Sequence, residues 1–207
     1  MLTPYRVDTN SLYLTGQLNQ LGVDVTFKSV VGDDLRRLVG AAQHALFRSD
    51  IVIFSGGLGP TEDDLTREAV AEALGLRLHR DAVIVAALEK RFLERGWKMS
   101  ANNTKQADVL EGATILPNPN GTAPGQWLSG EFDGREHIIL LLPGPPHEMK
   151  GIFENQVRER LQAKIPPAHI FTRTLKIAML GESTVDARVS PIYKRFPQVE
   201  TTILAGG

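Results

Sequence analysis

The part of the sequence best suited to chemistry is a segment rich in glycine, hydroxyl and carboxylate side chains, which reads Ser55-Gly56-Gly57-Leu58-Gly59-Pro60-Thr61-Glu62-Asp63-Asp64-Leu65-Thr66. Glycine lets a ligand approach the backbone closely and tolerates unusual dihedral angles. Thr61 and Asp64 are spaced like a capping box, so we expect a helix to begin here with free N–H groups, which favour an anion. The segment therefore predicts a phosphate-binding loop with ligand contacts from Ser55, Gly56, Gly57, Gly59, Thr61 and Thr66.

Acidic residues crowd the same segment, because Glu62, Asp63 and Asp64 follow one another. These side chains would repel a phosphate unless a cation lay between them. Since carboxylates hold Mg²⁺ beside substrate phosphates, we predict a metal-bridged diphosphate, with Asp63 and Asp64 as metal ligands and catalytic residues. In the plainer interpretation these two residues only cap a helix and the glycines only make a turn. The segment is not a P-loop, since Gly-Lys-Ser/Thr is absent.

A second group of functional residue types follows a later apolar run, in the order Pro143-Gly144-Pro145-Pro146-His147-Glu148-Met149. If both apolar runs are strands of one α/β sheet, their exits can converge on one cleft. We expect Pro143 and Gly144 to contact the ligand, His147 to act as a general base or ligand contact, and Glu148 to bind a ligand hydroxyl. The plainer interpretations are a surface histidine, and a Glu148 that caps the following helix.

Two polar stretches between these groups, at residues 102–107 and 118–125, contain many amide and turn residues. Lys105 is their only cation, so we expect it to contact a phosphate, and we expect Asn102 to orient the ligand. Ordinary turns are the plainer interpretation.

Helices and strands are expected to alternate along most of the chain. We predict helices at residues 9–21, from a cap at Asp33 or Asp34 to residue 46, at 66–74 with Gly75 as its C-terminal cap, at 83–96, and after Pro146 to residue 164. Strands are predicted at residues 23–27, 50–54 and 137–142. This order predicts an α/β fold with a doubly wound, mostly parallel sheet.

The pattern changes beyond Pro166-Pro167. A strand at 172–178, a helix at 182–193 and a strand at 200–204 would fit part of a small α+β unit. We therefore expect a boundary near Ile165, with domains at residues 1–165 and 166–207.

Composition limits the classes of function. The chain has 207 residues, 42% of them hydrophobic, and a formal net charge of −1, so no global basic field attracts nucleic acid. The absence of cysteine excludes a disulfide framework and a thiolate zinc site. No apolar run approaches the roughly 20 residues of a membrane-spanning helix, and no signal peptide is evident, so a soluble cytoplasmic protein is expected.

Five segments in this order closely resemble the N-terminal half of the CinA (competence/damage-inducible) family. They are Asp8-Thr9-Asn10-Ser11, Val31-Gly32-Asp33-Asp34, the loop from Gly56 to Thr66, the stretch from Asn118 to Gly125, and Leu142 to Met149. Gly181-Glu182-Ser183 resembles the short second subdomain of that family.

The resemblance implies a MoaB/Mog-type, molybdopterin-binding-like three-layer fold. It also implies metal-dependent hydrolysis of ADP-ribose to AMP and ribose 5-phosphate, with Mg²⁺ as the expected cation, K⁺ or Co²⁺ as alternatives, and a homodimer as the expected assembly. By matching position, Asp63 and Asp64 become the metal and phosphate residues.

The sequence departs from the family pattern at both ends. Family members begin with an apolar strand and a Gly-(Asp/Ser)-Glu-Leu-Leu motif, whereas Met1-Leu2 falls at the end of that stretch, so we expect the first strand to be missing. The chain also stops within the second subdomain, so the nicotinamide mononucleotide deamidation of longer members is not expected.

Two alternatives to hydrolysis stay open. The same loop would serve adenylyl transfer to a pterin, although the segment from Leu142 to Met149 argues against that reaction. The chain would otherwise be a non-catalytic nucleotide-binding module. Direct DNA binding has no basis, since the sequence contains no basic stripe or recognition motif.

Overall fold

The computed structural model describes residues 7–167 and 171–204. The chain divides into two compact units, Met1–Ile170 and Phe171–Gly207, which are described separately. Within the described ranges, no helix combines the length and apolar character needed to cross a membrane.

The first unit is built on a four-stranded sheet with the order β1-β6-β5-β4. Its strands are β1 (Ile51–Ser55), β4 (Thr114–Leu116), β5 (Gly125–Phe132) and β6 (Arg135–Leu142). β1 and β6 are parallel, whereas β5 pairs antiparallel with both β6 and β4. The sheet of the described residues is therefore mixed, with one parallel and two antiparallel strand pairs, whereas a mostly parallel sheet was expected.

A tight hairpin explains the antiparallel half of the sheet. Asp133 and Gly134 connect β5 to β6 and both have positive φ angles, of 50° and 76°. Positive φ at both central residues is typical of a type I′ turn, whose twist matches that of the two antiparallel strands it connects. No strand was predicted at residues 125–132, although Asp133-Gly134 is a strong hairpin signal.

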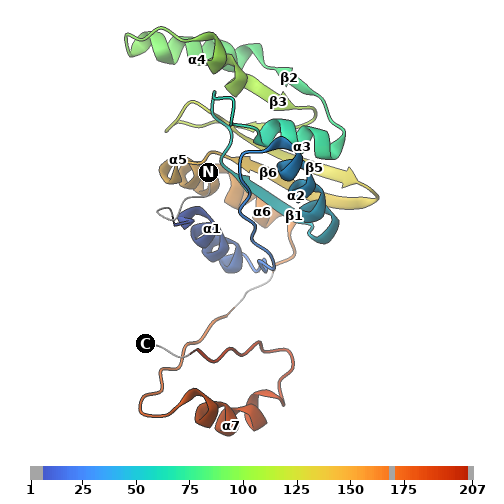
Figure 1. The fold of residues 1–207 in the computed structure, drawn as a ribbon, viewed down its shortest axis with the longest axis vertical. Helices are drawn as coiled ribbons and strands as arrows, with labels where there is room; N and C mark the ends of the chain where they lie inside the picture. The colour runs from blue at the N-terminus through green and yellow to red at the C-terminus, as the bar shows by residue number, and fades with distance from the viewer. Residues whose placement is uncertain (1–6, 168–170, 205–207) are drawn as a thin grey trace. The chain divides into compact units, whose positions relative to one another are not determined.

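Helices cover both faces of the sheet, which makes the first unit an α/β three-layer fold (Figure 1). One face carries α1 (Thr9–Gln20) and the continuous helical stretch of α5 (Pro146–Ile152), the π-helical segment η2 (Phe153–Val157) and α6 (Arg158–Lys164). The other face carries α2 (Leu35–Arg48) and α3 (Thr66–Leu74).

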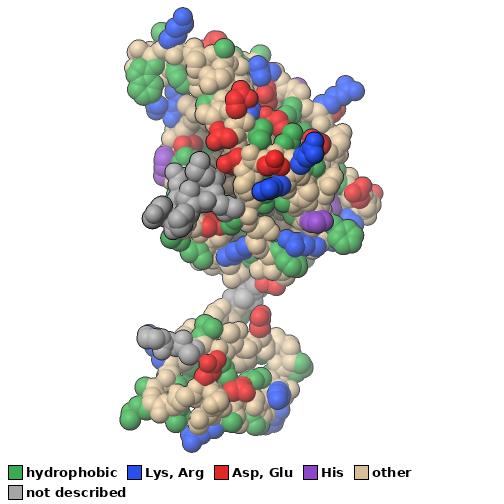
Figure 2. Space-filling model, viewed as in Figure 1, with side chains coloured by type: hydrophobic (Ala, Val, Ile, Leu, Met, Phe, Trp, Pro, Cys, Tyr) green, Lys and Arg blue, Asp and Glu red, His purple; other side chains and the backbone are tan. Residues whose placement is uncertain are grey.

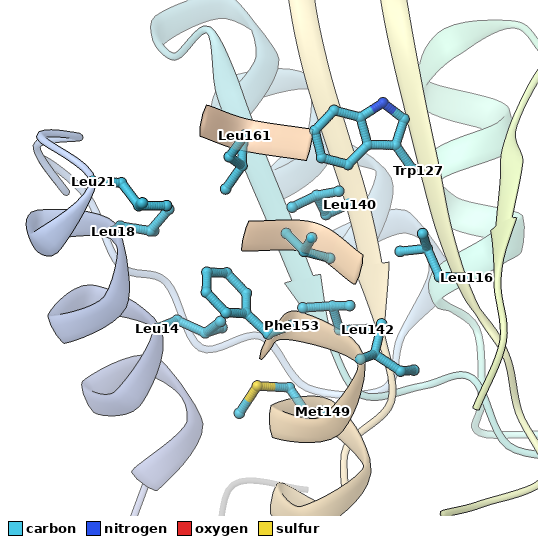
Figure 3. Packing of buried hydrophobic residues seen from close by; sticks show 12 residues of the cluster. Leu14, Leu18, Leu21, Leu116, Trp127, Leu140, Leu142, Met149, Phe153 and Leu161 are labelled. Atoms are coloured by element: carbon cyan, nitrogen blue, oxygen red, sulfur yellow. The ribbon is translucent and has the colours of Figure 1, made fainter. Parts of the chain in front are cut away.

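Alternate residues of β6 supply the two hydrophobic cores, because successive strand side chains point to opposite faces. Leu140 and Leu142 pack with α1 and the α5–α6 stretch, as Figure 3 shows, whereas Ile139 and Leu141 pack on the α3 side. All four side chains are fully buried. The β6 strand is therefore fixed from both faces, and so is the position of its carboxyl end.

A smaller substructure extends from the α3 side of the sheet (Figure 1). It contains an antiparallel pair, β2 (Leu78–Arg80) and β3 (Asp108–Leu110), with α4 (Ala82–Glu94) and the 3₁₀ segment η1 (Ala101–Ala107) between them. Asp81 caps α4 by accepting hydrogen bonds from the N–H groups of Val83 and Ile84. The predicted helix at 83–96 is thus confirmed.

The expected strand at residues 23–27 is wrong. This segment forms no strand, and within residues 7–167 and 171–204 no other strand pairs with the outer edge of β1. Residues 23–27 and β1 line a cavity of about 1010 Å³, together with residues of α1 and α2. Alternating side chains assign the faces of a strand, but the strand itself needs a hydrogen-bonding partner, which residues 23–27 lack here.

The second unit contains one helix among its described residues, α7 (Glu182–Tyr193), with the bounds that the sequence predicted. The strands expected at 172–178 and 200–204 are not formed. Their apolar side chains lie largely exposed, as at Leu175 and Leu204. Without a partner strand and a face to cover, β-propensity does not make a strand.

Candidate functional site

Two strand exits meet at one edge of the sheet, as the sequence analysis expected. Because β1 and β6 are parallel with Ser55 opposite Leu142, both carboxyl ends lie together. The Gly56 N–H donates to the Leu142 carbonyl at 2.9 Å. A Cβ at Gly144 would lie 3.4 Å from the Gly56 Cα, so the two backbones approach closely.

Asn10 joins these two exits, and the sequence analysis did not identify it as a site residue. Its Nδ2 donates to the Ser55 Oγ at 2.9 Å and to the Gly144 carbonyl at 2.8 Å. Its Oδ1 is buried without a hydrogen-bond partner among the described residues. The signal in sequence was only its place in Asp8-Thr9-Asn10-Ser11, where Asp8 caps α1.

The first half of the glycine-rich loop is held by Thr66. The Thr66 hydroxyl donates to the Gly56 carbonyl at 2.7 Å, and the Thr66 N–H donates to the Gly57 carbonyl at 3.2 Å. Gly57 has a φ of +68°, and a Cβ there would collide with the Thr66 hydroxyl. Thr66 therefore acts on the loop backbone, and glycine is required where it does so.

Two cations hold the second half of the loop. The guanidinium of Arg67 donates to the Leu58 carbonyl at 2.8 Å and to the Gly59 carbonyl at 3.0 Å. Lys105 donates to the Thr61 carbonyl at 3.2 Å and forms an ion pair with Glu68 at 3.1 Å. The structure thus brings Lys105 to the loop, where it contacts a carbonyl and a carboxylate.

These contacts give the loop two different sides. In a trans peptide the carbonyl and the following N–H point in opposite directions. Because Thr66 binds the Gly56 and Gly57 carbonyls, the N–H groups of Gly57 and Leu58 point away from Thr66. Within the described residues, the N–H groups of Gly57 and Leu58 have no hydrogen-bond acceptor. Consecutive outward N–H groups form an anion-binding concavity.

Asp63 and Asp64 converge on one hydroxyl. The Thr61 Oγ1 lies 2.5 Å from both Asp63 Oδ1 and Asp64 Oδ2, and the Thr61 N–H donates to Asp64 Oδ2 at 2.9 Å. Of the two capping-box contacts expected from the spacing, only the one from the Thr61 N–H to Asp64 is present, because the Asp64 N–H donates to the Thr61 backbone carbonyl. The helix does not begin there, however, because α3 starts at Thr66 and its N-cap residue Leu65 offers no side-chain hydrogen bond.

The surroundings of Asp64 favour its ionised form. Burial of the carboxylate acts to raise its pKa. Hydrogen bonds from the side chain and backbone of Thr61 and from the Gly59 backbone act in the opposite direction, as does the charge of Arg67. The pKa of Asp64 is lowered as a result, so the side chain is a carboxylate at neutral pH.

The carboxylate pair suits a cation that shares its ligands with a bound phosphate. Among the described residues there is no group of three or more His, Asp or Glu side chains that could hold a metal by themselves. Mg²⁺ is usually held by one or two carboxylates together with water and substrate phosphates. Asp63 and Asp64 fit that requirement.

Glu148 is held beside the second strand exit. Its Oε2 accepts a hydrogen bond from the Asn118 Nδ2 at 2.6 Å, and Asn120 donates to the His147 carbonyl at 3.3 Å. Pro143 is buried, whereas the His147 side chain is exposed. The stretch around Asn118 therefore lies against the second strand exit, a placement that its amide-rich composition did not indicate.

Arg91 and Gln106 also form hydrogen bonds with the stretch at 118–122. Arg91, from α4, donates to the carbonyls of Asn118, Pro119 and Gly121. Gln106, from η1, donates to the Thr122 hydroxyl at 2.9 Å.

Asn102 does not reach the loop through any hydrogen bond of the described residues. It accepts a hydrogen bond from the Ser100 hydroxyl at 2.6 Å, within its own turn.

Charge is mixed on the face of the molecule that Figure 2 shows. Acidic and basic side chains are interspersed there, in keeping with the formal net charge of −1.

Comparison with known proteins agrees with this fold. Residues 1–163 match the family described as the probable molybdopterin binding domain. CinA-like proteins of Koribacter versatilis and Solibacter usitatus are 58% and 52% identical to the chain, over 99% of its length in both cases. These matches cover 50% and 48% of the two relatives, so the chain spans about half of their length.

A solved structure supports the same assignment. The crystal structure of CinA from Thermoplasma acidophilum, described as a protein of unknown function, is 32% identical with a TM-score of 0.66, and the match covers 74% of this chain and 88% of that one. The chain therefore belongs to the probable molybdopterin-binding-domain family and, within it, to the CinA-like proteins.

Proposed function

We propose that the chain hydrolyses the diphosphate of a nucleotide such as ADP-ribose, with a divalent cation, to give AMP and ribose 5-phosphate. The observation that carries the proposal is the polarity of the glycine-rich loop. Its carbonyls are bound from behind by Thr66, Arg67 and Lys105, and the N–H groups of Gly57 and Leu58 have no acceptor in the described structure. Phosphate oxygens suit such donors.

The carboxylates beside the loop support the cation requirement. Asp63 and Asp64 would hold Mg²⁺, with K⁺ or Co²⁺ as alternatives, and a bound Mg²⁺ would neutralise the diphosphate and polarise its phosphorus–oxygen bonds. The lowered pKa of Asp64 keeps that ligand ionised at neutral pH. A diphosphate is thereby favoured over a neutral ligand at this loop.

The remaining contacts support a fixed geometry for the reaction. Water adds to one phosphorus and the bond to the bridging oxygen breaks, which places negative charge on the phosphate oxygens. Donors that are already in position stabilise that charge without reorganising. Asn10 keeps Ser55 and Gly144 together, so the two strand exits maintain their spacing during this step.

The test is release of AMP from ADP-ribose by the purified chain in the presence of Mg²⁺. Hydrolysis should stop when the cation is chelated, and substitution of Mg²⁺ by Co²⁺ or K⁺ identifies the preferred ion. Asp63→Ala/Asp64→Ala is expected to lose at least about 100-fold in kcat/KM, because both carboxylates that face the diphosphate are removed.

A matched control separates this loss from damage to the fold. Glu131→Ala/Glu136→Ala removes two exposed carboxylates that face each other across β5 and β6, far along the strands from the site, and should leave AMP release unchanged. Binding of ADP-ribose without turnover would instead support a nucleotide-binding module. Turnover only in the presence of a pterin would support adenylyl transfer.

A further inference from the structure

Arg67 is the largest fully buried side chain of the described residues, with 0% of its surface exposed. It shares the buried face of α3 with Val70 and Ala71, at the i, i+3 and i+4 positions. No carboxylate of the described residues lies within ion-pair distance of its guanidinium, and its Nε has no hydrogen-bond partner there. A charged group therefore occupies a position where an apolar side chain would pack.

Burying a charge without a directly paired partner is costly. A methionine would fill a similar volume next to Val70 without that cost. The two hydrogen bonds that the guanidinium forms instead both go to loop carbonyls, those of Leu58 and Gly59. Its position thus serves the conformation of the loop.

The Leu58–Gly59 peptide shows how this contact reaches the site. Arg67 binds its carbonyl, so its N–H points in the opposite direction. That N–H, on Gly59, is directed to the Asp64 carboxylate. A Cβ at Gly59 would collide with the same carboxylate, so the contact is close. Arg67 and Asp64 therefore hold one peptide from opposite sides.

We propose that Arg67 is a positioning residue of the diphosphate site, which fixes the Leu58–Gly59 peptide so that its N–H keeps the Asp64 carboxylate in place beside the loop. Arg67 does not touch the ligand, since its side chain is buried behind the loop. The nature of the ligand rests on the proposed function, whereas the effect of Arg67 on the loop does not.

The test compares Arg67→Met and Arg67→Lys with the unaltered chain. Binding of inorganic pyrophosphate in the presence of Mg²⁺ is measured by calorimetry, at a temperature where circular dichroism shows each protein fully folded. Loss of two charge-assisted hydrogen bonds to the loop should weaken binding by about tenfold to a hundredfold in Arg67→Met. The lysine of Arg67→Lys can hold only one carbonyl at a time, so its pyrophosphate affinity should lie between those of Arg67→Met and the unaltered chain.

A spectroscopic readout distinguishes positioning from general stability. The amide signals of Gly57, Leu58 and Gly59 should move in both variants, and their response to pyrophosphate should shrink. Arg135→Met is the matched control, because Arg135 also donates to a backbone carbonyl, that of Phe47, but at the opposite end of β6. It should leave pyrophosphate affinity and the loop signals unchanged.

Several results would overturn the proposal. One is a folded Arg67→Met that binds pyrophosphate as tightly as the unaltered chain. If Arg67→Met does not fold, unchanged pyrophosphate affinity in Arg67→Lys would overturn the proposal. If the unaltered chain binds pyrophosphate but does not hydrolyse ADP-ribose, only the proposed reaction fails. If it does not bind pyrophosphate, both proposals fail.

Discussion

Gly57 is the loop position at which a side chain conflicts most directly with the structure. Its φ of +68° is rare for other residues, and a Cβ would collide with the Thr66 hydroxyl that holds Gly56. We expect Gly57→Ala to prevent Mg²⁺-dependent pyrophosphate binding and to destabilise the fold by about 1–3 kcal/mol. Calorimetry and urea unfolding measure the two effects.

Gly16 provides the control for this change. It lies within α1, and a Cβ there meets no atom within 4 Å. Gly16→Ala should therefore stabilise the chain by about 0.5–1 kcal/mol and leave binding intact. Pyrophosphate affinity that survives in Gly57→Ala would argue that the loop N–H groups do not hold the anion.

At the scale of residues, types were easier to predict than contacts. Glycine and carboxylate residues indicate possible chemistry by their type alone, so the loop and the Asp63 and Asp64 pair were candidates from the sequence. Lys105 was predicted near the ligand, but its ion pair with Glu68 depends on how η1 packs against α3. The role of Arg67 depends on the same packing, so spacing along the chain did not indicate it.

At the scale of elements, local signals predicted the helices and nonlocal pairing decided the strands. Asp34 caps α2 and Gly75 ends α3 with a φ of +66°, and both signals are contained in a few consecutive residues. The strand expected at 23–27 needed a partner elsewhere in the chain and did not form. The apolar runs at 50–54 and 137–142 did predict β1 and β6, and Asp133-Gly134 was a local signal for the β5–β6 hairpin that was not used.

Tyr13 links α1 to the π-helical segment and makes that link sensitive to pH. Its hydroxyl donates to Glu154 Oε1 at 2.7 Å. Burial raises the pKa of Tyr13, and the hydrogen bond and the negative charge of Glu154 raise it further. The folded state therefore favours the neutral phenol. Its contribution to stability is complete below the ordinary tyrosine pKa of about 10 and is lost as pH rises through the higher folded-state value.

Tyr13→Phe tests this link. The variant should be less stable than the unaltered chain at pH 8, because the Glu154 carboxylate loses a donor, and the difference should shrink above about pH 10. Urea unfolding at both pH values measures it. Tyr193→Phe, in the second unit, is the control for tyrosine chemistry outside this link and should not change the unfolding of the first unit. A difference that stays constant with pH would contradict the assignment.

At the scale of the whole first unit, β6 is the element on which both cores depend. Its side chains alternate between the α1 side and the α3 side, and its carboxyl end carries one of the two loops of the site. The α/β class was predictable because strands rich in aliphatic residues alternate with helices. The strand order was not predictable, because it depends on which strands far apart in the sequence pair with one another in the folded chain.

Leu140→Ala should measure how strongly this arrangement depends on packing at the centre of the sheet. Leu140 is fully buried and lies opposite Trp127 on β5, with both side chains in the same core (Figure 3). The cavity should cost about 2–5 kcal/mol of the free energy of unfolding, seen as a lower urea midpoint when unfolding is followed by tryptophan fluorescence. Leu175→Ala, at a position 85% exposed in the second unit, should change the free energy of unfolding of the first unit by less than about 0.5 kcal/mol. Similar losses in the two variants would mean that the first unit does not draw its stability from the β5–β6 core.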